Sequence, residues 1–299
     1  VRPTCFTQMC AARLNEAHVF DYHHHSEFSV DCTASMADIC RVAVERGVSE
    51  IAFTEHMDFI PEEKNTGYFR YDAYMESIRR CREQFRDELA IVAGIEVDYC
   101  PDFENETAKW VEEREFDFVI GSVHYLRGKG NISEPRALDF FRGKTEREAY
   151  GEYWDVVLRC ARFGIWDTLG HIDVVKRYGT QVFGPFDETR HAEALGEILS
   201  TLVTKRIALE INTSGLRQPS AECYPSAALL RRYRELGGER ITVGSDSHSV
   251  EHTGAGVLFG LRMARETGFA HVERFCRRKR SAVPISLEFE PGNERLLQQ

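Results

Sequence analysis

The feature that most constrains this chain is the alternation of short apolar runs with segments of helical spacing. Seven runs rich in Val, Ile and Phe have the length and composition of β-strands. They are residues 18–22, 50–54, 89–97, 116–123, 166–170, 207–212 and 241–245. Strands that alternate with helices build βαβ units around a parallel sheet. Seven such units without a change in composition predict an α/β chain folded as a closed or nearly closed barrel.

The clearest helical segment is SMADICRVAVERG, residues 35–47. Ser35 can cap this helix with Asp38 in its first turn, and Gly47 stands where a helix ends. The apolar residues recur at helical spacing and form one stripe, Met36, Ile39, Ala43 and Val44. A basic run near the C-terminus, RFCRRKR at 274–280, is interpreted as a solvated helix end rather than a binding patch.

Polar side chains follow the apolar runs, at the point where each predicted strand ends. In chain order they are His23, His24 and His25, then Glu55 and His56, Glu96 and Asp98, His124, His171 and Asp173, Glu210 and Asn212, and Asp246 and His248. The carboxyl ends of barrel strands converge on one face, where active sites are built. A single histidine is commonly a buried core residue, but this repetition at successive strand ends favours a metal site. His24 is expected on the opposite face, because side chains alternate along a strand.

The ligand types limit the metal and the reaction. Imidazole nitrogen and carboxylate oxygen without thiolate suit Zn, Mn or Fe. Six histidines with several carboxylates exceed what one ion needs, and a carboxylate such as Glu96 can bridge two ions. Two ions about 3.5–4 Å apart activate water and hold both oxygens of an in-line displacement at phosphorus. Phosphate-ester hydrolysis is therefore the leading hypothesis, and amide or lactone hydrolysis is the competing one.

Several motifs resemble those of the PHP (polymerase and histidinol phosphatase) superfamily. The segments that carry the resemblance are DYHHHSEFSVD, FTEHMD, GIEVD, GSVHY, GHID and GSDSH, over about residues 19–287. Within the superfamily, FTEHMDF, GIEVDY, GHIDVVKRYG and LEINTSGLR are similar to the monofunctional histidinol-phosphate phosphatase branch. The resemblance implies a distorted (β/α)7, TIM-like barrel with a trinuclear metal centre at the C-terminal ends of the strands. It assigns one domain to residues 18–299, after an extension, residues 1–17, of unassigned role.

Carried over position by position, the resemblance implies three sets of metal ligands. The first metal takes His23, His25, Glu96 and Asp246; the second shares Glu96 and adds His124 and His171; the third takes Asp31, His56 and His248. Asp31 enters only through the resemblance, since its loop position predicts a turn residue. Supporting hydrogen bonds are expected from Glu55, Asn212 and Ser245, with Glu55 holding a metal-bound histidine. Glu55 stands where many superfamily members have aspartate.

The expected reaction is hydrolysis of L-histidinol phosphate to L-histidinol and phosphate, a step of histidine biosynthesis. A hydroxide that bridges the first two metals would attack phosphorus, with two or three divalent ions (Zn, Mn or Fe) in the site. A chain of net charge −10 needs local positive charge to bind a dianion, so Arg177 and Arg217 are interpreted as phosphate ligands. No residue is assigned as the acid that protonates the leaving group.

Three alternatives stay open from the sequence. One is a phosphoesterase of the same superfamily that acts on a nucleotide or another small phosphate ester. Another is a barrel without catalysis that serves as an interaction module, although the nine predicted ligand positions all carry competent residues. A binuclear amidohydrolase is less favoured, because such sites usually use a bridging lysine and no predicted strand end offers one.

Composition excludes other classes of partner and compartment. The acidic balance argues against nucleic acid, whose binding needs a basic surface. Apolar runs stay well below the roughly 20 residues that span a bilayer, and no membrane partner is expected. Nine scattered cysteines without a C-x-x-C pair predict reduced thiols, and a cytoplasmic location is expected. Nothing in the sequence indicates an oligomeric state.

Overall fold

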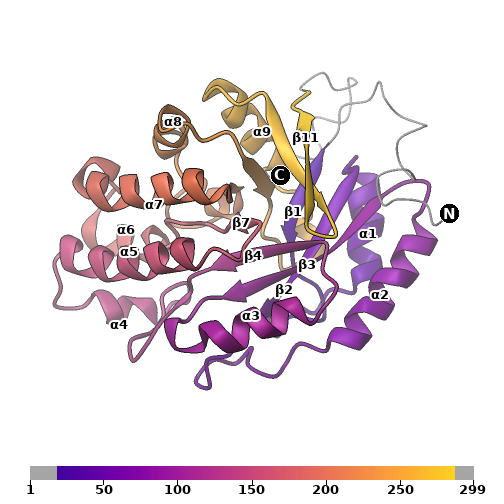
Figure 1. Ribbon diagram of the computed structural model, residues 1–299, viewed down its shortest axis with the longest axis horizontal. Helices are drawn as coiled ribbons and strands as arrows, with labels where there is room; N and C mark the ends of the chain where they lie inside the picture. Colours follow the sequence, from indigo (N-terminus) through magenta and orange to yellow (C-terminus); the bar gives the residue numbers. More distant parts are fainter. Residues whose placement is uncertain (1–18, 287–299) are drawn as a thin grey trace.

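Seven parallel strands form one sheet in the order β1-β2-β3-β4-β7-β8-β9 (Figure 1). The structure, a computed structural model, describes residues 19–286; the predicted extension at 1–17 lies outside them. The strands are β1 (Phe20–His24), β2 (Glu50–Met57), β3 (Ala90–Asp98), β4 (Phe118–Ser122), β7 (Thr168–Leu169), β8 (Ala208–Asn212) and β9 (Ile241–Gly244). The last strand returns to the first, because His25 N donates to Ser247 O at 2.9 Å and Asp246 N to His23 O at 2.8 Å. The predicted, nearly closed barrel is confirmed.

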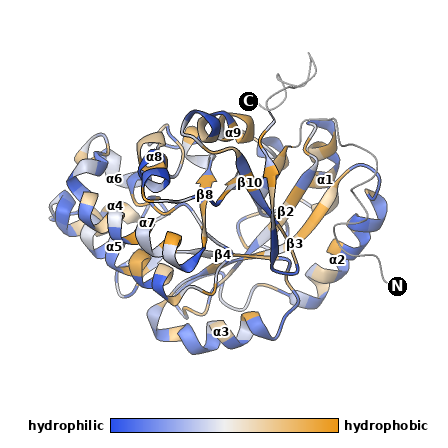
Figure 2. Ribbon diagram, turned by 45° about the horizontal axis from the view of Figure 1, so that its top comes forward, coloured by the Kyte–Doolittle hydropathy of each residue, from blue (hydrophilic) through white to orange (hydrophobic). Residues whose placement is uncertain are grey.

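Each predicted strand run overlaps a strand of this sheet, and the ends differ by a few residues. The reason is that both faces of a parallel barrel strand are buried, so the strand reads as a continuous apolar run. Strands β1, β4, β8 and β9 are buried at every position. Figure 2 shows the result as hydrophobic colour on the strands and hydrophilic colour on the outward faces of the helices.

Helices surround the sheet. They are α1 (Met36–Glu45), α2 (Tyr71–Gln84), α3 (Glu104–Glu112), α4 (Ala137–Phe141), α5 (Glu146–Phe163), α6 (Lys176–Phe183), α7 (Ala192–Lys205), α8 (Ala227–Glu235) and α9 (Val257–Glu266). Short 3-10 turns, η1 to η4, lie at Pro101–Phe103, Glu188–His191, Ser214–Arg217 and Val250–His252. Among residues 19–286, no helix combines the length and apolarity needed to cross a membrane.

Helix α1 follows its sequence prediction. The side chain of Ser35 accepts from Asp38 N at 3.1 Å, and Gly47 takes the left-handed φ of 73° that ends the helix. The buried face comprises Met36, Ile39, Cys40 and Ala43. Cys40 is one of six buried free thiols in the described part of the chain. Cys276 is disulfide-bonded, so the prediction of reduced thiols is wrong for this residue.

The basic run 274–280 is not a helix end, so that prediction was wrong. It forms the turn of an antiparallel hairpin, β10 (His271–Cys276) and β11 (Lys279–Pro284, labelled in Figure 1). Arg277 and Arg278 take left-handed φ values of 48° and 61°, as a two-residue hairpin turn requires. Alternation appears in β11, where Ser281 and Val283 are half-buried and Ala282 and Pro284 are exposed, as in a strand with one face covered.

The hairpin covers the N-terminal end of the barrel. Arg278 donates to the carboxylate of Asp167, just before β7, and to Ile165 O. Arg277 N donates to Asp117 Oδ1 at 2.8 Å, just before β4. The arginines of the turn therefore bind acids of the barrel itself. A second, shorter hairpin, β5 (Tyr125–Leu126) and β6 (Gly130–Asn131), lies at the other end, after β4.

Phe275 carries the apolar part of this contact, and its loss should destabilise the fold. It is 4% exposed, with its ring centroid 4.9 Å from that of Phe118 and 6.3 Å from that of Tyr22. Phe275→Ala is expected to lower the free energy of unfolding by about 3 kcal/mol, measured by urea titration at fixed metal concentration. The matched control is Phe259→Ala on α9, where the side chain is 51% exposed and the change should stay within about 0.5 kcal/mol. Equal stability of the two variants would contradict this packing.

Candidate metal centre

The nine predicted ligands all lie at the C-terminal end of the barrel. His23 belongs to β1, His56 to β2 and Glu96 to β3, and the others follow strands: His25 and Asp31 after β1, His124 after β4, His171 after β7, Asp246 and His248 after β9. Strand β9 can approach β1 closely because it ends in Gly244, where a Cβ would come within 2.4 Å of His23 Cβ. Asp246 adopts a left-handed φ of 49°, a conformation that aspartate tolerates better than most residues.

Four of these ligand atoms form a first group around one point. Glu96 Oε2 lies 3.4 Å from His23 Nε2 and 3.6 Å from His25 Nε2; Asp246 Oδ1 lies 3.7 Å and 3.5 Å from the same two nitrogens. Ligands bonded at about 2.1 Å in a tetrahedron are about 3.4 Å apart. His23 Nε2, His25 Nε2 and Glu96 Oε2 are buried without a hydrogen-bond partner among residues 19–286. The group therefore fits a metal ion.

The other oxygen of Glu96 faces a second group. Glu96 Oε1 lies 2.9 Å from His171 Nε2 and 3.6 Å from His124 Nε2, and the two nitrogens are 3.1 Å apart. A single carboxylate thus reaches both groups, one with each oxygen. This is the geometry of a bridging ligand.

A third group gathers Asp31, His56 and His248. His56 Nε2 lies 3.6 Å from Asp31 Oδ2 and 3.2 Å from His248 Nε2, and His248 Nε2 lies 3.7 Å from Asp31 Oδ1. Ligand atoms of His25, His56 and His248 are also close enough to share an ion. The side chains implied by the resemblance are thus brought together in three adjacent clusters. All three reach Glu96, since His56 Nδ1 of the third lies 2.9 Å from Glu96 Oε2.

The histidines of the three groups differ in the direction of their pKa shifts, whereas the carboxyl of Glu96 is ionised. Burial opposes ionisation of Glu96, but His23, His124 and His56 hold the pKa of its carboxyl well below the usual value. Burial lowers the pKa of His124 to about 3 and also lowers the pKa of His25 and His248. Burial also opposes the charge of His23, His56 and His171, but nearby carboxylates outweigh it and raise the pKa of all three, so a metal ion would displace a proton from each. A neutral imidazole beside an ionised carboxylate is the state in which both bind metal.

Glu55 supports the cluster through a serine. Its carboxylate accepts from Ser26 N at 3.0 Å, from the Ser26 hydroxyl at 2.6 Å and from the Ser29 hydroxyl at 2.6 Å. Ser29 Oγ lies 3.0 Å from His25 Nδ1. Glu55 thus reaches the histidine indirectly. Burial raises the pKa of its carboxyl to about 7.

The other two predicted supporting residues, Asn212 and Ser245, have different hydrogen-bond partners. Asn212 donates to Asp246 Oδ2 at 3.1 Å, so it contacts a predicted ligand side chain. Ser245 instead donates to Asp21 Oδ2 at 2.6 Å, and Asp21 also accepts from Ser245 N at 2.8 Å. Ser245 therefore joins β9 to β1 through buried Asp21.

Three residues that support the cluster were not assigned this role from the sequence. Glu210 Oε1 lies 2.6 Å from His23 Nδ1 and its Oε2 accepts from His171 N at 2.7 Å. Ser122 donates to Glu96 Oε1 at 2.6 Å, and Asp98 accepts from His124 N at 2.7 Å. With its Nδ1 proton directed to Glu210, His23 presents the lone pair of Nε2 to the cluster. The strand-end position of Glu210 and Asp98 was the signal, but it does not separate a ligand from a supporting group.

A cavity of about 430 Å³ opens onto the cluster. Its wall includes His56, His171 and Asp246 together with Arg177 and Arg217. Arg217 donates to Ser245 O at 2.7 Å, which directs its guanidinium along the wall. Arg177 Nε is buried without a hydrogen-bond partner in the described part of the chain. The predicted arginines and the predicted ligands therefore face one space.

A second cationic group stands at the rim of the cavity. Lys64 Nζ lies 2.8 Å from Glu134 and 3.9 Å from Asp31, and Lys64 and Glu134 both line the space. Asn65 and Asn131 complete this polar side of the wall. The wall of the cavity thus carries cationic and amide side chains around the imidazoles and carboxylates of the cluster.

Fold and cluster together define a β/α barrel with a ligand set for several metal ions at the C-terminal ends of its strands. Residues 21–214 match the sequence profile of the PHP domain. The chain belongs to the PHP domain family.

Similar proteins match most of the chain. A histidinol-phosphatase of Lactococcus lactis is 32% identical over 256 residues, 85% of this chain and 93% of the relative. A probable histidinol-phosphatase of Clostridium acetobutylicum is 28% identical over 82% of this chain and 92% of its own length. The crystal structure of the Lactococcus lactis histidinol phosphate phosphatase with zinc, L-histidinol and phosphate has a TM-score of 0.81, at 31% identity over 88% of this chain and 98% of that one. A putative histidinol phosphatase from Listeria monocytogenes has a TM-score of 0.70 at 25% identity, over 79% of this chain and 98% of that one.

Because Glu210 orients His23, its loss should weaken metal binding although it is not itself a predicted ligand. Glu210→Gln is expected to raise the metal dissociation constant by about 10-fold or more, measured by competition with a chromophoric chelator. The control is Glu113→Gln, an exposed glutamate after α3, which should leave the constant unchanged. Equal affinities in both variants would remove Glu210 from the support of the cluster.

Proposed function

We propose that this chain is a metal-dependent phosphomonoesterase that hydrolyses L-histidinol phosphate to L-histidinol and phosphate. The observation that carries the proposal is the arrangement around Glu96, in which one carboxylate joins two ligand groups beside a cavity that also holds two arginines. The proposal agrees with the names of the relatives and with the zinc, L-histidinol and phosphate in the similar structure.

We infer the following assignment of ligands, which rests on the distances within each group. The first ion takes His23, His25, Glu96 and Asp246; the second takes Glu96, His124 and His171; the third takes Asp31, His56 and His248. Two or three divalent ions are proposed, and zinc is favoured because the similar structure contains it. When bound, such ions supply Lewis-acid polarisation of the phosphate and a water of lowered pKa.

The protein contributes binding and orientation. Arg177 and Arg217 are proposed to bind the phosphate oxygens, since a guanidinium can donate two hydrogen bonds to one phosphate. Arg217 is held by the Ser245 carbonyl, so part of the cost of ordering it is already met by the fold. Glu210 and the Ser29–Glu55 pair hold two histidine rings from behind, which keeps their Nε2 atoms directed at the cluster.

The proposed substrate is tested by comparing phosphate esters under one metal condition. We expect kcat/KM for L-histidinol phosphate to exceed that for a nucleoside monophosphate and for p-nitrophenyl phosphate by about 100-fold or more, since a second polar end of the substrate adds discrimination. Phosphate release from each ester with Zn or Mn supplied is the measurement. Equal or better turnover of the nucleotide would keep a metal phosphoesterase and overturn the substrate. No hydrolysis of any ester by metal-loaded protein would overturn the enzyme assignment.

The arginines are tested separately from the metals. Arg177→Ala and Arg217→Ala should each reduce kcat/KM by about 10-fold or more, because each removes charge-assisted hydrogen bonds worth about 1.5–3 kcal/mol. Metal content, measured by mass spectrometry, should not change. The control is Arg86→Ala, whose side chain is 74% exposed and whose kcat/KM should match the unaltered chain. A loss of metal in either cavity variant would mean that these arginines stabilise the cluster instead.

A further inference from the structure

Lys176, at the start of α6, is a lysine whose side chain is completely buried. Its ammonium lies 2.8 Å from Asp173 Oδ2, 2.9 Å from Glu222 Oε1 and 3.0 Å from Cys223 O. The ammonium thus forms ion pairs with two carboxylates and donates a hydrogen bond to the Cys223 carbonyl. Burying a lysine is costly unless it is paired in this way, so the site calls for an explanation.

The three acceptors come from two different segments. Asp173 lies in the loop that leads from His171 into α6, and a turn closes this loop where Arg177 N donates to Val174 O at 2.9 Å. Glu222 and Cys223 lie in the segment after η3. Lys176 therefore joins the first turn of α6, which carries Arg177, to a segment that is distant in the sequence.

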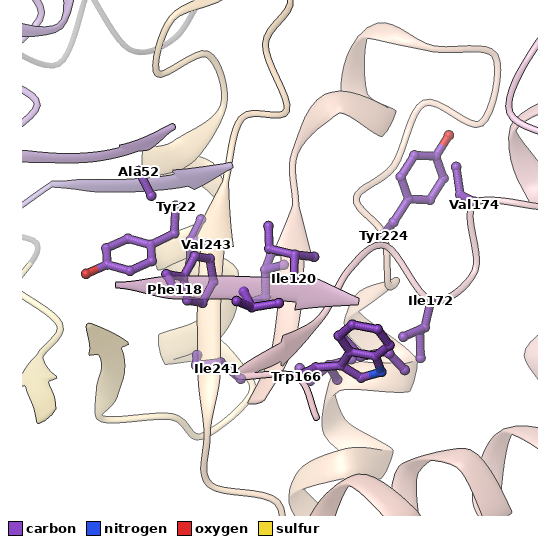
Figure 3. Packing of buried hydrophobic residues seen from close by; sticks show 14 of the residues in the cluster. Tyr22, Ala52, Phe118, Ile120, Trp166, Ile172, Val174, Tyr224, Ile241 and Val243 are labelled. Carbon is purple, nitrogen blue, oxygen red and sulfur yellow. The ribbon is translucent and has the colours of Figure 1, made fainter. Parts of the chain in front are cut away.

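That second segment is packed on the turn that carries Arg217. A Cβ on Gly215 would come within 2.0 Å of Glu222 O, so only glycine permits this approach. Tyr224 exchanges two backbone hydrogen bonds with Asn212, at 2.8 and 2.9 Å, which fix the segment to the end of β8. Val174 of the first loop and Tyr224 of the second both belong to the buried apolar cluster (Figure 3). A shift of Glu222 would thus be transmitted to η3 and Arg217.

The two arginines need such a restraint. Both arginines line the cavity. Burial lowers the pKa of Arg217, and the positive charge of Arg177 lowers it further. Two neighbouring guanidinium groups repel one another before an anion binds. The carboxylates of Asp173 and Glu222 add negative charge to the same two segments, and the ammonium between them keeps the segments together.

We propose that Lys176 is a positioning residue that fixes Arg177 and Arg217 relative to one another and so sets the affinity of the cavity for phosphate. Lys176 does not line the cavity and acts only through the two segments that it joins. The inference rests on the proposed role of the arginines as phosphate ligands. It adds Lys176, a residue outside the cavity, to the groups that this role requires. A small displacement of such groups is enough to weaken the binding of phosphate strongly.

The test is phosphate binding by the metal-loaded protein, measured by isothermal titration calorimetry with inorganic phosphate. In Lys176→Met the dissociation constant for phosphate should rise by about 10-fold or more. A tenfold rise corresponds to a loss of about 1.4 kcal/mol of binding free energy. KM should rise in parallel while kcat falls less than about threefold, because the ligand groups stay in place. Bound metal per chain should be unchanged, and Lys176→Arg should restore part of the affinity.

Two further variants separate positioning from folding. The double variant Asp173→Asn/Lys176→Met removes the unpaired buried carboxylate that the single change leaves, so it tests the lost connection rather than a buried charge. Glu222→Gln alters only the second segment at a half-exposed side chain, and should weaken phosphate binding in the same direction by a smaller factor. Lys109→Met on α3, 75% exposed, is the control without effect.

The outcomes are distinguishable from failure of the proposed function. Unchanged phosphate affinity in both the double variant and Glu222→Gln would overturn the role of Lys176, even if the chain hydrolyses L-histidinol phosphate. Weakened phosphate binding in those variants would support it even if another ester proved to be the substrate. A wild-type protein that binds no phosphate would overturn both the arginine site and Lys176.

Discussion

The cluster depends on one buried carboxylate, Glu96 at the end of β3. Its Oε2 faces His23 and His25, and its Oε1 faces His124 and His171. An ionised carboxylate that is 1% exposed is costly unless cations and hydrogen bonds compensate it. Ser122 supplies one hydrogen bond, and the two ligand groups supply positions for cations on both sides. The barrel satisfies this requirement because neighbouring strands end around β3, so histidines distant in the sequence can meet a single glutamate.

The two ends of the barrel serve different purposes. At the N-terminal end, acids that precede the strands bind the arginines of the β10–β11 turn, and Phe275 packs onto Tyr22 and Phe118. At the C-terminal end, acids that follow the strands face histidines and leave atoms without protein partners among residues 19–286. Barrels of this type generally separate stability from chemistry in this way. Ion pairs and hydrogen bonds therefore stabilise the N-terminal end of the barrel. The ligand atoms at the C-terminal end can bind a cation.

Much of the fold could be predicted from the sequence, because a strand buried on both faces is a continuous apolar run and a capped helix has recognisable ends. The strand-end histidines were predicted for the same reason, since parallel strands direct their carboxyl ends to one face. Asp31 was found only through the resemblance, because a loop residue has no periodicity. The hairpin was misjudged because its arginines gain their partners, Asp117 and Asp167, from distant segments. Glu210 and Lys176 are identified by contacts across the fold, which the local pattern does not encode.

The central claim is that these residues form one cluster of metal sites joined by Glu96. Anomalous diffraction from crystals of the zinc-loaded protein, with data on both sides of the zinc absorption edge, tests this claim most directly. Two or three anomalous peaks are expected within about 2.0–2.3 Å of the ligand atoms. One should lie among His23, His25, Glu96 and Asp246, and another among Glu96, His124 and His171. Peaks elsewhere on the protein, or a single peak that leaves one oxygen of Glu96 without an ion, would contradict the bridging role of this carboxylate.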